Sequence, residues 1–420
     1  IRRVCKENRS LFFLFVPVLW TSLEYIRSTH STFGFSWLGL GYSQFKTLPV
    51  IQMAEITGVY GISWLIMLVN AGLYLSWKTW RERGAESTEN VINMGARFLS
   101  VTILVFACWW GYGSITMNRY NPNTDNNSGL TVGLIQGNVE QLMKWNPVYQ
   151  KLVMSKYRDL TLKAAQSNPQ LIIWPETALP FYYNQHPVGT EFVKDLARQT
   201  QTSILFGSPH RENRDGQTIQ YNSAYLVSDT GDTQNRYDKI HLVPFGEFVP
   251  FRELLFFVEK MVEMIGDFGR GKEATLFDVA GRQAGVSICY EIIFPDLLRQ
   301  TVKNGAHFLI NITNDAWFGK SPASYQHMSM GALRAVENRV PIVRAANTGV
   351  SGTIDANGAL RDETELFVEA AQITKITPRQ GGITFYTAYG DVFSWLCLFA
   401  TGVIAIAARR NRRAAGGNEQ

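Results

Sequence analysis

The sequence predicts an α/β domain flanked by transmembrane α-helices. Apolar residues make up 46% of the chain, and they concentrate at its two ends. Residues from about 120 to 380 read instead as a globular mixture, in which short apolar runs alternate with amphipathic stretches. With 420 residues the chain can hold two structural units, because a domain usually takes roughly 100–200 residues.

Two segments are long and apolar enough to cross a membrane. Residues 57–77 and 98–117 contain no charged side chain, over about the length that spans a hydrocarbon core of ~30 Å. Residues 392–408 form a third, slightly short candidate, and residues 11–26 form a fourth that contains Glu24. For each segment the alternative is a buried helix of a globular core.

Basic residues predict the orientation of these helices, because Lys and Arg resist translocation and so mark cytoplasmic loops. Three basic clusters precede the first candidate helix, separate the two long ones and follow the last. They comprise Arg2, Arg3, Lys6, Arg9, Lys78, Arg81, Arg83, Arg97, Arg409, Arg410, Arg412 and Arg413. All three clusters fall on one side if the chain crosses at each candidate, which places residues 118–391 outside the cytoplasm. The net charge of +5 is then explained by topology, and we expect no nucleic acid partner.

The predicted domain boundaries follow from these spans. Residues 1–117 form a membrane domain, residues 118–388 an extracytoplasmic catalytic domain, and residues 389–420 a C-terminal transmembrane helix with a basic cytoplasmic tail. The polar run 118–129 links membrane and domain. Residues 29–56 are rich in Trp, Phe and Tyr and lie on the outer side, either as an interfacial anchor or as the lining of a lipid entrance.

Within the outer domain, runs rich in β-branched and aromatic residues are bounded by turn residues, which is typical of strands. The predicted strands are 131–136, 170–176, 203–209, 221–229, 284–291, 307–313, 341–347 and 350–356. The predicted helices are 148–166, 189–200, 294–304 and 325–339. This alternation favours layered α/β packing with buried strands, in which loops at the strand ends carry the chemistry.

Cys289 is the single cysteine that this topology leaves in the outer domain. Cys5 is expected in the cytoplasm, and Cys108 and Cys397 are expected inside helices. Disulfide-using domains normally have an even number of cysteines. Cys289 is therefore either a small buried hydrophobe or a reactive thiol.

Glu176, Lys239 and Cys289 stand at the ends of predicted buried strands, where α/β proteins build their sites. A carboxylate can accept the proton of a thiol, and a Lys ammonium can stabilise the negative charge that develops. The same lysine, with backbone N–H groups after the cysteine, could stabilise the oxyanion of a tetrahedral intermediate. Taken singly, Glu176 could be a surface carboxylate and Lys239 a solvated basic residue.

The order Glu, Lys, Cys resembles the triad of the nitrilase (carbon–nitrogen hydrolase) superfamily, and the surrounding runs resemble one family within it, the bacterial apolipoprotein N-acyltransferases. These runs are QGNVEQLMKWNP (136–147), IIWPETALP (172–180), YDKIHLVPFGEFVP (237–250), GDFGRGKE (266–273), SICYEIIFPD (287–296) and NITNDAWFGKSPASYQH (311–327). They span the outer domain, and soluble nitrilases lack the KWNP and PFGEFVP elements. The resemblance implies a nitrilase-like α-β-β-α sandwich flanked by transmembrane helices.

For the chemistry, the resemblance implies a ping-pong acyl transfer, the last step of lipoprotein maturation. Cys289 would attack an acyl ester of a membrane phospholipid, with Glu176 as general base and Lys239 as the cation that stabilises the oxyanion. The thioester would then pass its acyl chain to the α-amino group of the diacylglyceryl-Cys of an apolipoprotein. Glu247 would orient the lysine or the amine. Exposing an acyl chain to water costs about 0.8 kcal/mol per methylene, so this thiol should lie at the bilayer surface.

Three further site residues follow from the resemblance. Tyr290 and Glu291 would shape the pocket and position the acyl ester, although Tyr290 could chiefly supply its backbone N–H and Glu291 could form a structural ion pair. Trp145 would sit on a mobile loop over the lipid entrance, or serve as an interfacial anchor. We expect a monomer that crosses the bacterial cytoplasmic (inner) membrane several times, with its catalytic domain on the periplasmic side.

Other signals give no reason to expect a metal or a cofactor. Residues 266–272 match part of a phosphate-binding loop, but Glu273 stands where Ser or Thr should coordinate magnesium. The histidines lack zinc-ligand spacing. The sequence contains no G-x-S-x-G elbow, which argues against a serine lipase. Two alternatives to the acyltransferase remain: a membrane-anchored amidase that uses the same triad on small C–N substrates, and a non-catalytic protein whose outer domain binds lipid or lipoprotein.

Overall fold

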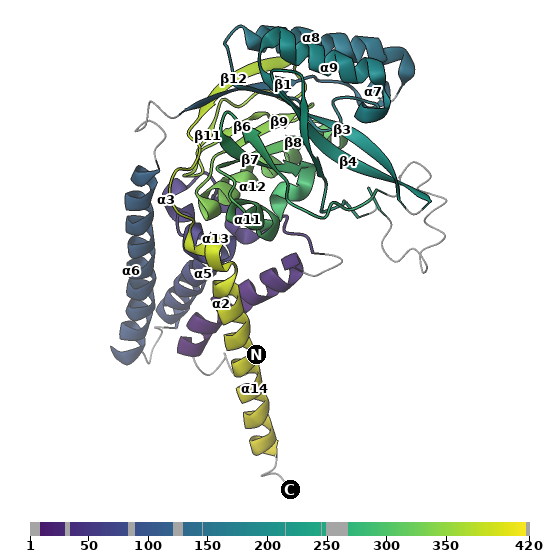
Figure 1. The fold of residues 1–420 in the computed structure, drawn as a ribbon. Helices are drawn as coiled ribbons and strands as arrows, with labels where there is room; N and C mark the ends of the chain where they lie inside the picture. Colours follow the sequence, from purple (N-terminus) through teal and green to yellow (C-terminus); the bar gives the residue numbers. More distant parts are fainter. Residues whose placement is uncertain are drawn as a thin grey trace. The chain divides into compact units, whose positions relative to one another are not determined.

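The computed structural model describes residues 9–29, 34–82, 89–120, 129–144, 146–214, 216–244, 246–248 and 268–416. The residues divide into two compact units, one of Ile1–Tyr120 with Thr384–Gln420 and the other of Asn121–Ile383 (Figure 1). Several residues singled out from the sequence lie outside the described part, namely Arg2, Arg3, Cys5, Lys6, Arg83 and Trp145.

In the described part of the first unit, three helical stretches are long and apolar enough to cross a membrane. They are α2 (Arg9–Thr29), α5 (Val59–Arg81) and the Met94–Arg119 stretch of α6 (Glu89–Arg119). A shorter apolar stretch, Val392–Ala407, lies in α14 (Val392–Gly416). The four predicted spans are thus confirmed as helices.

The span predicted at 57–77 begins two residues later than expected. Gly58 has a φ of +64° and ends the short helix α4 (Ala54–Thr57), so that α5 starts afresh at Val59. A Cβ at Gly58 would lie 2.7 Å from the ring of Tyr386. Glycine is therefore required here both by the backbone conformation and by the space available.

Glu24, the acidic residue within α2, has hydrogen-bond partners inside the first unit. Its carboxylate accepts hydrogen bonds from the Ser63 hydroxyl at 2.6 Å, the Leu40 N–H at 3.1 Å and the Trp20 indole at 3.0 Å. Polar groups within membrane-spanning helices need such internal partners, because lipid offers none. The three donors explain why an apolar helix tolerates this residue.

The described strands of the second unit form two six-stranded sheets. The first has the order β12-β1-β2-β3-β4-β5, and the second has the order β11-β10-β9-β8-β7-β6. The strands of the first sheet are β1 (Leu130–Gln136), β2 (Leu171–Ile173), β3 (Ser203–Arg214), β4 (Gln217–Val227), β5 (Thr233–Asp238) and β12 (Ala370–Ile376). Those of the second are β6 (Leu276–Val279), β7 (Arg282–Ile288), β8 (Phe308–Thr313), β9 (Ile342–Ala346), β10 (Gly352–Ile354) and β11 (Leu360–Arg361). In the first sheet β1, β2 and β3 are parallel neighbours, in the second β7, β8 and β9 are, and every other neighbouring pair is antiparallel.

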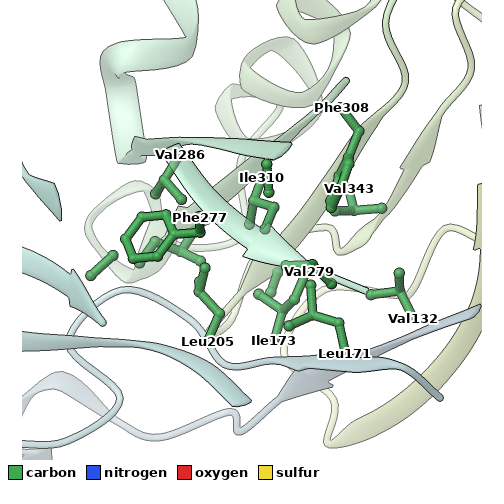
Figure 2. Packing of buried hydrophobic residues seen from close by; sticks show 14 of the residues in the cluster. Val132, Leu171, Ile173, Leu205, Phe277, Val279, Val286, Phe308, Ile310 and Val343 are labelled. Carbon is green, nitrogen blue, oxygen red and sulfur yellow. The ribbon is translucent and has the colours of Figure 1, made fainter. Parts of the chain in front are cut away.

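The sheets pack face to face through a shared hydrophobic core. Figure 2 shows Leu171, Ile173 and Leu205 of the first sheet opposite Phe277 and Val286 of the second. Each of these side chains is almost fully buried, and burial of a side chain of this size stabilises the fold by about 1.5–3 kcal/mol.

Helices cover the outer face of each sheet. In Figure 1, α8 (Gln150–Ala165) and α9 (Pro187–Thr200) lie over the first sheet, and α11 (Pro295–Lys303) and α12 (Ala323–Asn338) lie beside the second. Buried apolar residues of α8 and α9 pack with the outward-facing side chains of the first sheet. The predicted α-β-β-α sandwich is therefore confirmed.

Candidate active site

Cys289 follows β7 directly and opens a short 3-10 turn, η5 (Cys289–Ile293). Its φ is +55°, a left-handed conformation that is uncommon for residues with a side chain and is often found at functional sites. The Ile288 N–H donates to the Glu291 carboxylate at 2.7 Å, which holds the turn. As a whole residue, Cys289 is neither fully buried nor fully exposed.

Glu176 lies three residues beyond β2 and is largely buried. Its two carboxylate oxygens accept separate hydrogen bonds, one from the Asn222 side-chain amide at 2.7 Å and one from the Asn314 N–H at 2.8 Å. Strand β3 passes so close that a Cβ at Gly207 would lie 2.7 Å from the Glu176 Cα. These contacts fix the carboxylate rather than leave it free to rotate.

Lys239 follows β5 and is 1% exposed. Its Nζ lies 2.8 Å from a Glu247 oxygen and 3.6 Å from a Glu176 oxygen. Burial alone would lower the pKa of Lys239, but the carboxylates of Glu247 and Glu176 raise it above its ordinary value. The ammonium therefore stays charged inside the site.

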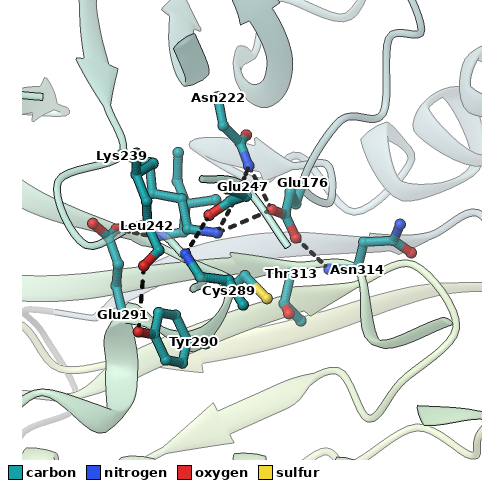
Figure 3. Close-up of polar contacts among 12 residues, drawn as sticks. Glu176, Asn222, Lys239, Leu242, Glu247, Cys289, Tyr290, Glu291, Thr313 and Asn314 are labelled. Atoms are coloured by element: carbon teal, nitrogen blue, oxygen red, sulfur yellow. Dashed lines mark hydrogen bonds and ion pairs between the residues drawn. The ribbon is translucent and has the colours of Figure 1, made fainter. Parts of the chain in front are cut away.

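Glu247 shares its partners with Glu176. The amide of Asn222 donates to both carboxylates, at 2.7 Å to Glu176 and 3.0 Å to Glu247. The second oxygen of Glu247 accepts the Val243 N–H at 2.9 Å. Figure 3 shows Lys239 and Asn222 held between the two carboxylates, an arrangement that places one buried cation between two acceptors.

The Cys289 side chain lies near this charged cluster and beside Thr313 (Figure 3). Burial and the charge of Glu176 raise the pKa of the Cys289 thiol to about 12, although Lys239 opposes that rise. At neutral pH the sulfur therefore carries its proton. Nucleophilic attack needs a base that accepts this proton as the new bond forms, and Glu176 is the fixed carboxylate on that side of the sulfur.

Glu291 is fully buried and connects the nucleophile turn to the segment after Lys239. Its carboxylate accepts hydrogen bonds from four donors, which are the Tyr237 hydroxyl at 2.9 Å and the N–H groups of Ile288 at 2.7 Å, Ile240 at 2.7 Å and His241 at 2.9 Å. Burial raises the pKa of Glu291 to about 7, and the backbone donors oppose the rise. With its oxygens so engaged, Glu291 joins the turn at the nucleophile to the segment after Lys239.

Tyr290 is buried at the side of the same turn. Its ring packs edge-on against Phe294 with centroids 4.9 Å apart, and its hydroxyl donates a long hydrogen bond of 3.5 Å to the Leu242 carbonyl. The side chain therefore forms part of the wall beside Cys289. The Tyr290 N–H belongs to the peptide bond that follows Cys289.

Sequence reasoning missed Lys144, which stands in the KWNP run just before Trp145. Lys144 is 1% exposed and its Nζ donates to the Glu176 carbonyl at 3.0 Å. Burial lowers the pKa of Lys144 to about 8, although Glu176 opposes the shift. The position of Lys144 in the KWNP run was the one sequence signal for this residue. Only the fold shows that its partner is the Glu176 carbonyl.

The amide bridge of Asn222 and the Asn314 N–H were also not predicted. Asn222 is on β4, and Asn314 follows β8, so chain folding alone brings them to Glu176. In the described part of the chain, no group of three or more His, Cys, Asp or Glu is arranged to hold a metal ion.

Comparisons with known proteins match both units. The carbon-nitrogen hydrolase family model matches residues 113–379, and the apolipoprotein N-acyltransferase N-terminal domain model matches residues 1–72. An apolipoprotein N-acyltransferase of Geobacter metallireducens is 43% identical, over 98% of this chain and 77% of its own. Another, of Methylococcus capsulatus, is 36% identical over 97% and 75%. Among solved structures, a carbon-nitrogen hydrolase from Helicobacter pylori G27 aligns with a TM-score of 0.47 at 16% identity, over 60% of this chain and 89% of that chain.

Proposed function

The chain belongs to the apolipoprotein N-acyltransferase family of carbon–nitrogen hydrolases, and from this premise we propose that it moves an acyl chain from a membrane phospholipid to an apolipoprotein. The acceptor is the α-amino group of a diacylglyceryl-Cys. The main support is the convergence of Glu176, Lys239 and Cys289 from three separate strand ends, with Glu176 and Lys239 3.6 Å apart. These residues supply the base, the cation and the nucleophile that such a transfer needs.

In the first half-reaction, the Cys289 sulfur attacks the ester carbonyl of the phospholipid while Glu176 accepts the thiol proton. The carbonyl oxygen becomes an oxyanion, which the Lys239 ammonium and the Tyr290 N–H stabilise. The bond between the carbonyl carbon and the ester oxygen then breaks. Glu176 returns its proton to the departing oxygen, so a lysophospholipid leaves and a thioester remains on Cys289.

In the second half-reaction, the α-amino group attacks the thioester carbonyl and Glu176 accepts a proton from the nitrogen. The intermediate collapses by breaking the carbon–sulfur bond, and the sulfur is reprotonated from Glu176. Glu247 keeps Lys239 oriented through both halves by its contact of 2.8 Å. Glu176 begins and ends each half-reaction as a carboxylate, as a repeating cycle requires.

We also propose that the protein crosses the bacterial inner membrane several times and carries the catalytic unit on its periplasmic side. The support is the apolar helices together with the basic residues Lys78, Arg81, Arg97 and Arg409, which favour the cytoplasmic side of the spans. The enzyme would act as a monomer, because the proposed site is built from one chain. The proposed role of Trp145 over the lipid entrance rests on sequence alone.

The test is to incubate the purified full chain with phospholipid that carries a labelled acyl chain. We expect label that hydroxylamine releases, which is the behaviour of a thioester, and we expect none in Cys289→Ala. Cys108→Ala and Cys397→Ala are matched controls, because they remove the other described free cysteines and should keep the label. Absence of label with intact amide hydrolysis would favour an amidase. Complementation of a deficient strain by Cys289→Ala would indicate a non-catalytic protein.

A further inference from the structure

The backbone carbonyl of Cys289 is held from two sides. It accepts a hydrogen bond from the Asn311 side-chain amide at 3.1 Å and lies 3.2 Å from the His327 Nε2. A carbonyl oxygen has two lone pairs and can accept both donors. Since this oxygen only accepts, the Nε2 of His327 carries a hydrogen.

Fixing this carbonyl also fixes the N–H of the next residue. The peptide unit between Cys289 and Tyr290 is planar, and no cis peptide bond occurs in the described part of the chain, so the carbonyl and the Tyr290 N–H point in opposite directions. Asn311 and His327 are fully buried, which directs the carbonyl into the core. The Tyr290 N–H is thereby directed away from Asn311 and His327.

A buried network holds both donors. Arg344 donates to the Asp315 carboxylate at 2.8 Å and also binds the Asn311 side-chain oxygen. The His327 Nδ1 lies 3.0 Å from the Arg344 guanidinium and 3.1 Å from Asp315. Arg344, Asp315 and His327 are all at most 1% exposed.

Such a network is not the simplest way to stabilise a core. Ionic groups are costly to bury, and apolar residues of similar volume often replace them without loss of stability. Asn311 also donates to the Ser287 carbonyl and Arg344 to the Val350 carbonyl, but Asn311 and His327 meet at the carbonyl of the nucleophile. The position of the network suggests a role in aligning that peptide unit.

We infer that His327, held by Asp315 and Arg344, is a positioning residue that aims the Tyr290 N–H at the oxyanion of the acyl transfer. The inference rests on the proposed function, since it assumes that Cys289 attacks an acyl carbonyl. His327 touches neither substrate nor sulfur in this scheme. It acts through the peptide plane that follows the nucleophile.

The test compares two uncharged substitutions, His327→Ala and His327→Gln, in the full-length enzyme. Glutamine retains an N–H donor at about the reach of Nε2, whereas alanine has none. Loss of a whole oxyanion donor costs about 100- to 1,000-fold in rate, so a misdirected one should cost on the order of tenfold. We expect acylation of Cys289 by p-nitrophenyl palmitate to be slower by that factor in His327→Ala than in His327→Gln.

Alkylation of Cys289 by iodoacetamide is the second readout, because attack on a saturated carbon builds no oxyanion. We expect the alkylation rates of the two variants to agree within about twofold. Equal loss of acylation and alkylation would mean that His327 only supports the fold, and equal acylation in both variants would also overturn the inference. If His327→Ala fails to fold, Asn311→Ala removes the other donor and is judged by the same two rates.

Thr301→Val is the matched control. It also removes a buried side-chain donor to a backbone carbonyl, namely the Thr301 hydroxyl, which donates to the Leu297 carbonyl. It should leave the ratio of acylation to alkylation unchanged. The activated ester also separates this inference from the proposed function. If the wild-type enzyme reacts with the ester but gives no thioester with phospholipid, the proposed lipid donor fails while the role of His327 is still decided.

Discussion

At the scale of single residues, the chemistry depends on a thiol that burial keeps protonated. The charge of Glu176 adds to the effect of burial and raises the pKa of Cys289 to about 12, while Lys239 opposes it. A carboxylate beside such a thiol thus has two opposite effects. It disfavours the free thiolate, yet it provides the base that removes the proton during attack.

Glu176→Gln should separate these two effects. Acylation should fall by about 100- to 10,000-fold, the usual contribution of a general base. Iodoacetamide should alkylate Cys289 faster than in the wild type at pH 8–9, because loss of the negative charge lowers the pKa of the thiol. Single-turnover acylation and alkylation rates measure the two quantities. A parallel fall in both rates would contradict the role of Glu176 as base.

Lys239→Met should destabilise the protein as well as inactivate it. The substitution leaves the carboxylates of Glu176 and Glu247 without their shared cation, and breaking a buried ion pair costs about 3–5 kcal/mol. Adding Glu247→Gln should recover part of the free energy of unfolding but no acylation. Denaturant unfolding and acylation assays provide the measurement. Recovery of acylation by the double variant would rule out Lys239 as the oxyanion-stabilising cation.

The sequence identified these titratable residues because they occur in recognisable runs. It did not identify Asn222, which donates to both Glu176 and Glu247, since an asparagine within an apolar strand has no distinctive pattern. For Glu291 it left open a role in the pocket or a structural ion pair, and it could not show that four protein donors surround that carboxylate. Such partnerships come from chain segments far apart in sequence.

At the scale of elements, the strands of the sandwich interior were predicted and several edge strands were not. Strands β2, β8 and β9 are buried along their whole length and read as apolar runs. The missed strand β5 (Thr233–Asp238) lies at a sheet edge with polar and exposed residues. The run predicted at 284–291 ends at Ile288, because Cys289 adopts a positive φ.

The glycine-rich run that partly matched a phosphate loop has a structural role instead. The Phe268 N–H donates to the Glu247 carbonyl at 3.1 Å, and the Gly271 N–H donates to the Lys239 carbonyl at 2.8 Å. This backbone strap therefore holds Lys239, which carries the ammonium, and Glu247, whose carboxylate contacts it. A Cβ at Gly271 would lie 1.9 Å from the Asp238 carbonyl oxygen, which a rigid strand end cannot accommodate.

Gly271→Ala should accordingly displace Lys239 and slow acylation by about tenfold or more, since even a 1 Å misplacement at an active site can cost about 100-fold. Gly381→Ala is the control, because no atom lies within 4 Å of a Cβ built there. It should keep wild-type acylation. Equal rates in the two variants would exclude a role for the strap in placing Lys239.

At the scale of the whole molecule, length and hydropathy were sufficient to predict the spans and the separate globular unit. They could not predict how Glu24 is satisfied, because Ser63 and Leu40 reach it only when the helices pack. They also gave no sign of the buried Asp315–Arg344 pair, whose members stand 29 residues apart in otherwise ordinary strands and loops.

That pair should make the stability of the globular unit depend on pH. Burial alone would raise the pKa of Asp315, but Arg344 and His327 hold it well below its ordinary value. The carboxylate therefore stabilises the fold above the unfolded pKa of about 3.9, and this contribution is lost as the pH falls below that value. Unfolding of wild type and Asp315→Asn between pH 3 and 7 measures it. A constant difference between the two across that range would contradict the depressed pKa.

The proposed orientation is testable by cysteine labelling in a background without native cysteines. Gly381→Cys, which is exposed on the globular unit, should react with a membrane-impermeant maleimide in intact spheroplasts. Glu82→Cys, exposed just after α5, should react only after permeabilisation. The reverse pattern would place the catalytic unit in the cytoplasm.

The fate of an isolated acyl-enzyme tests the central claim most directly. Full-length enzyme would be acylated with a phospholipid of defined chain length, separated from free lipid and mixed with a synthetic diacylglyceryl-Cys peptide. We predict that mass spectrometry will find the acyl chain leaving Cys289 and appearing as an amide on the peptide amino group, faster than it appears as free fatty acid. Release to water alone, or an adduct that persists in Cys289→Ala, would contradict an N-acyl transfer through this thiol.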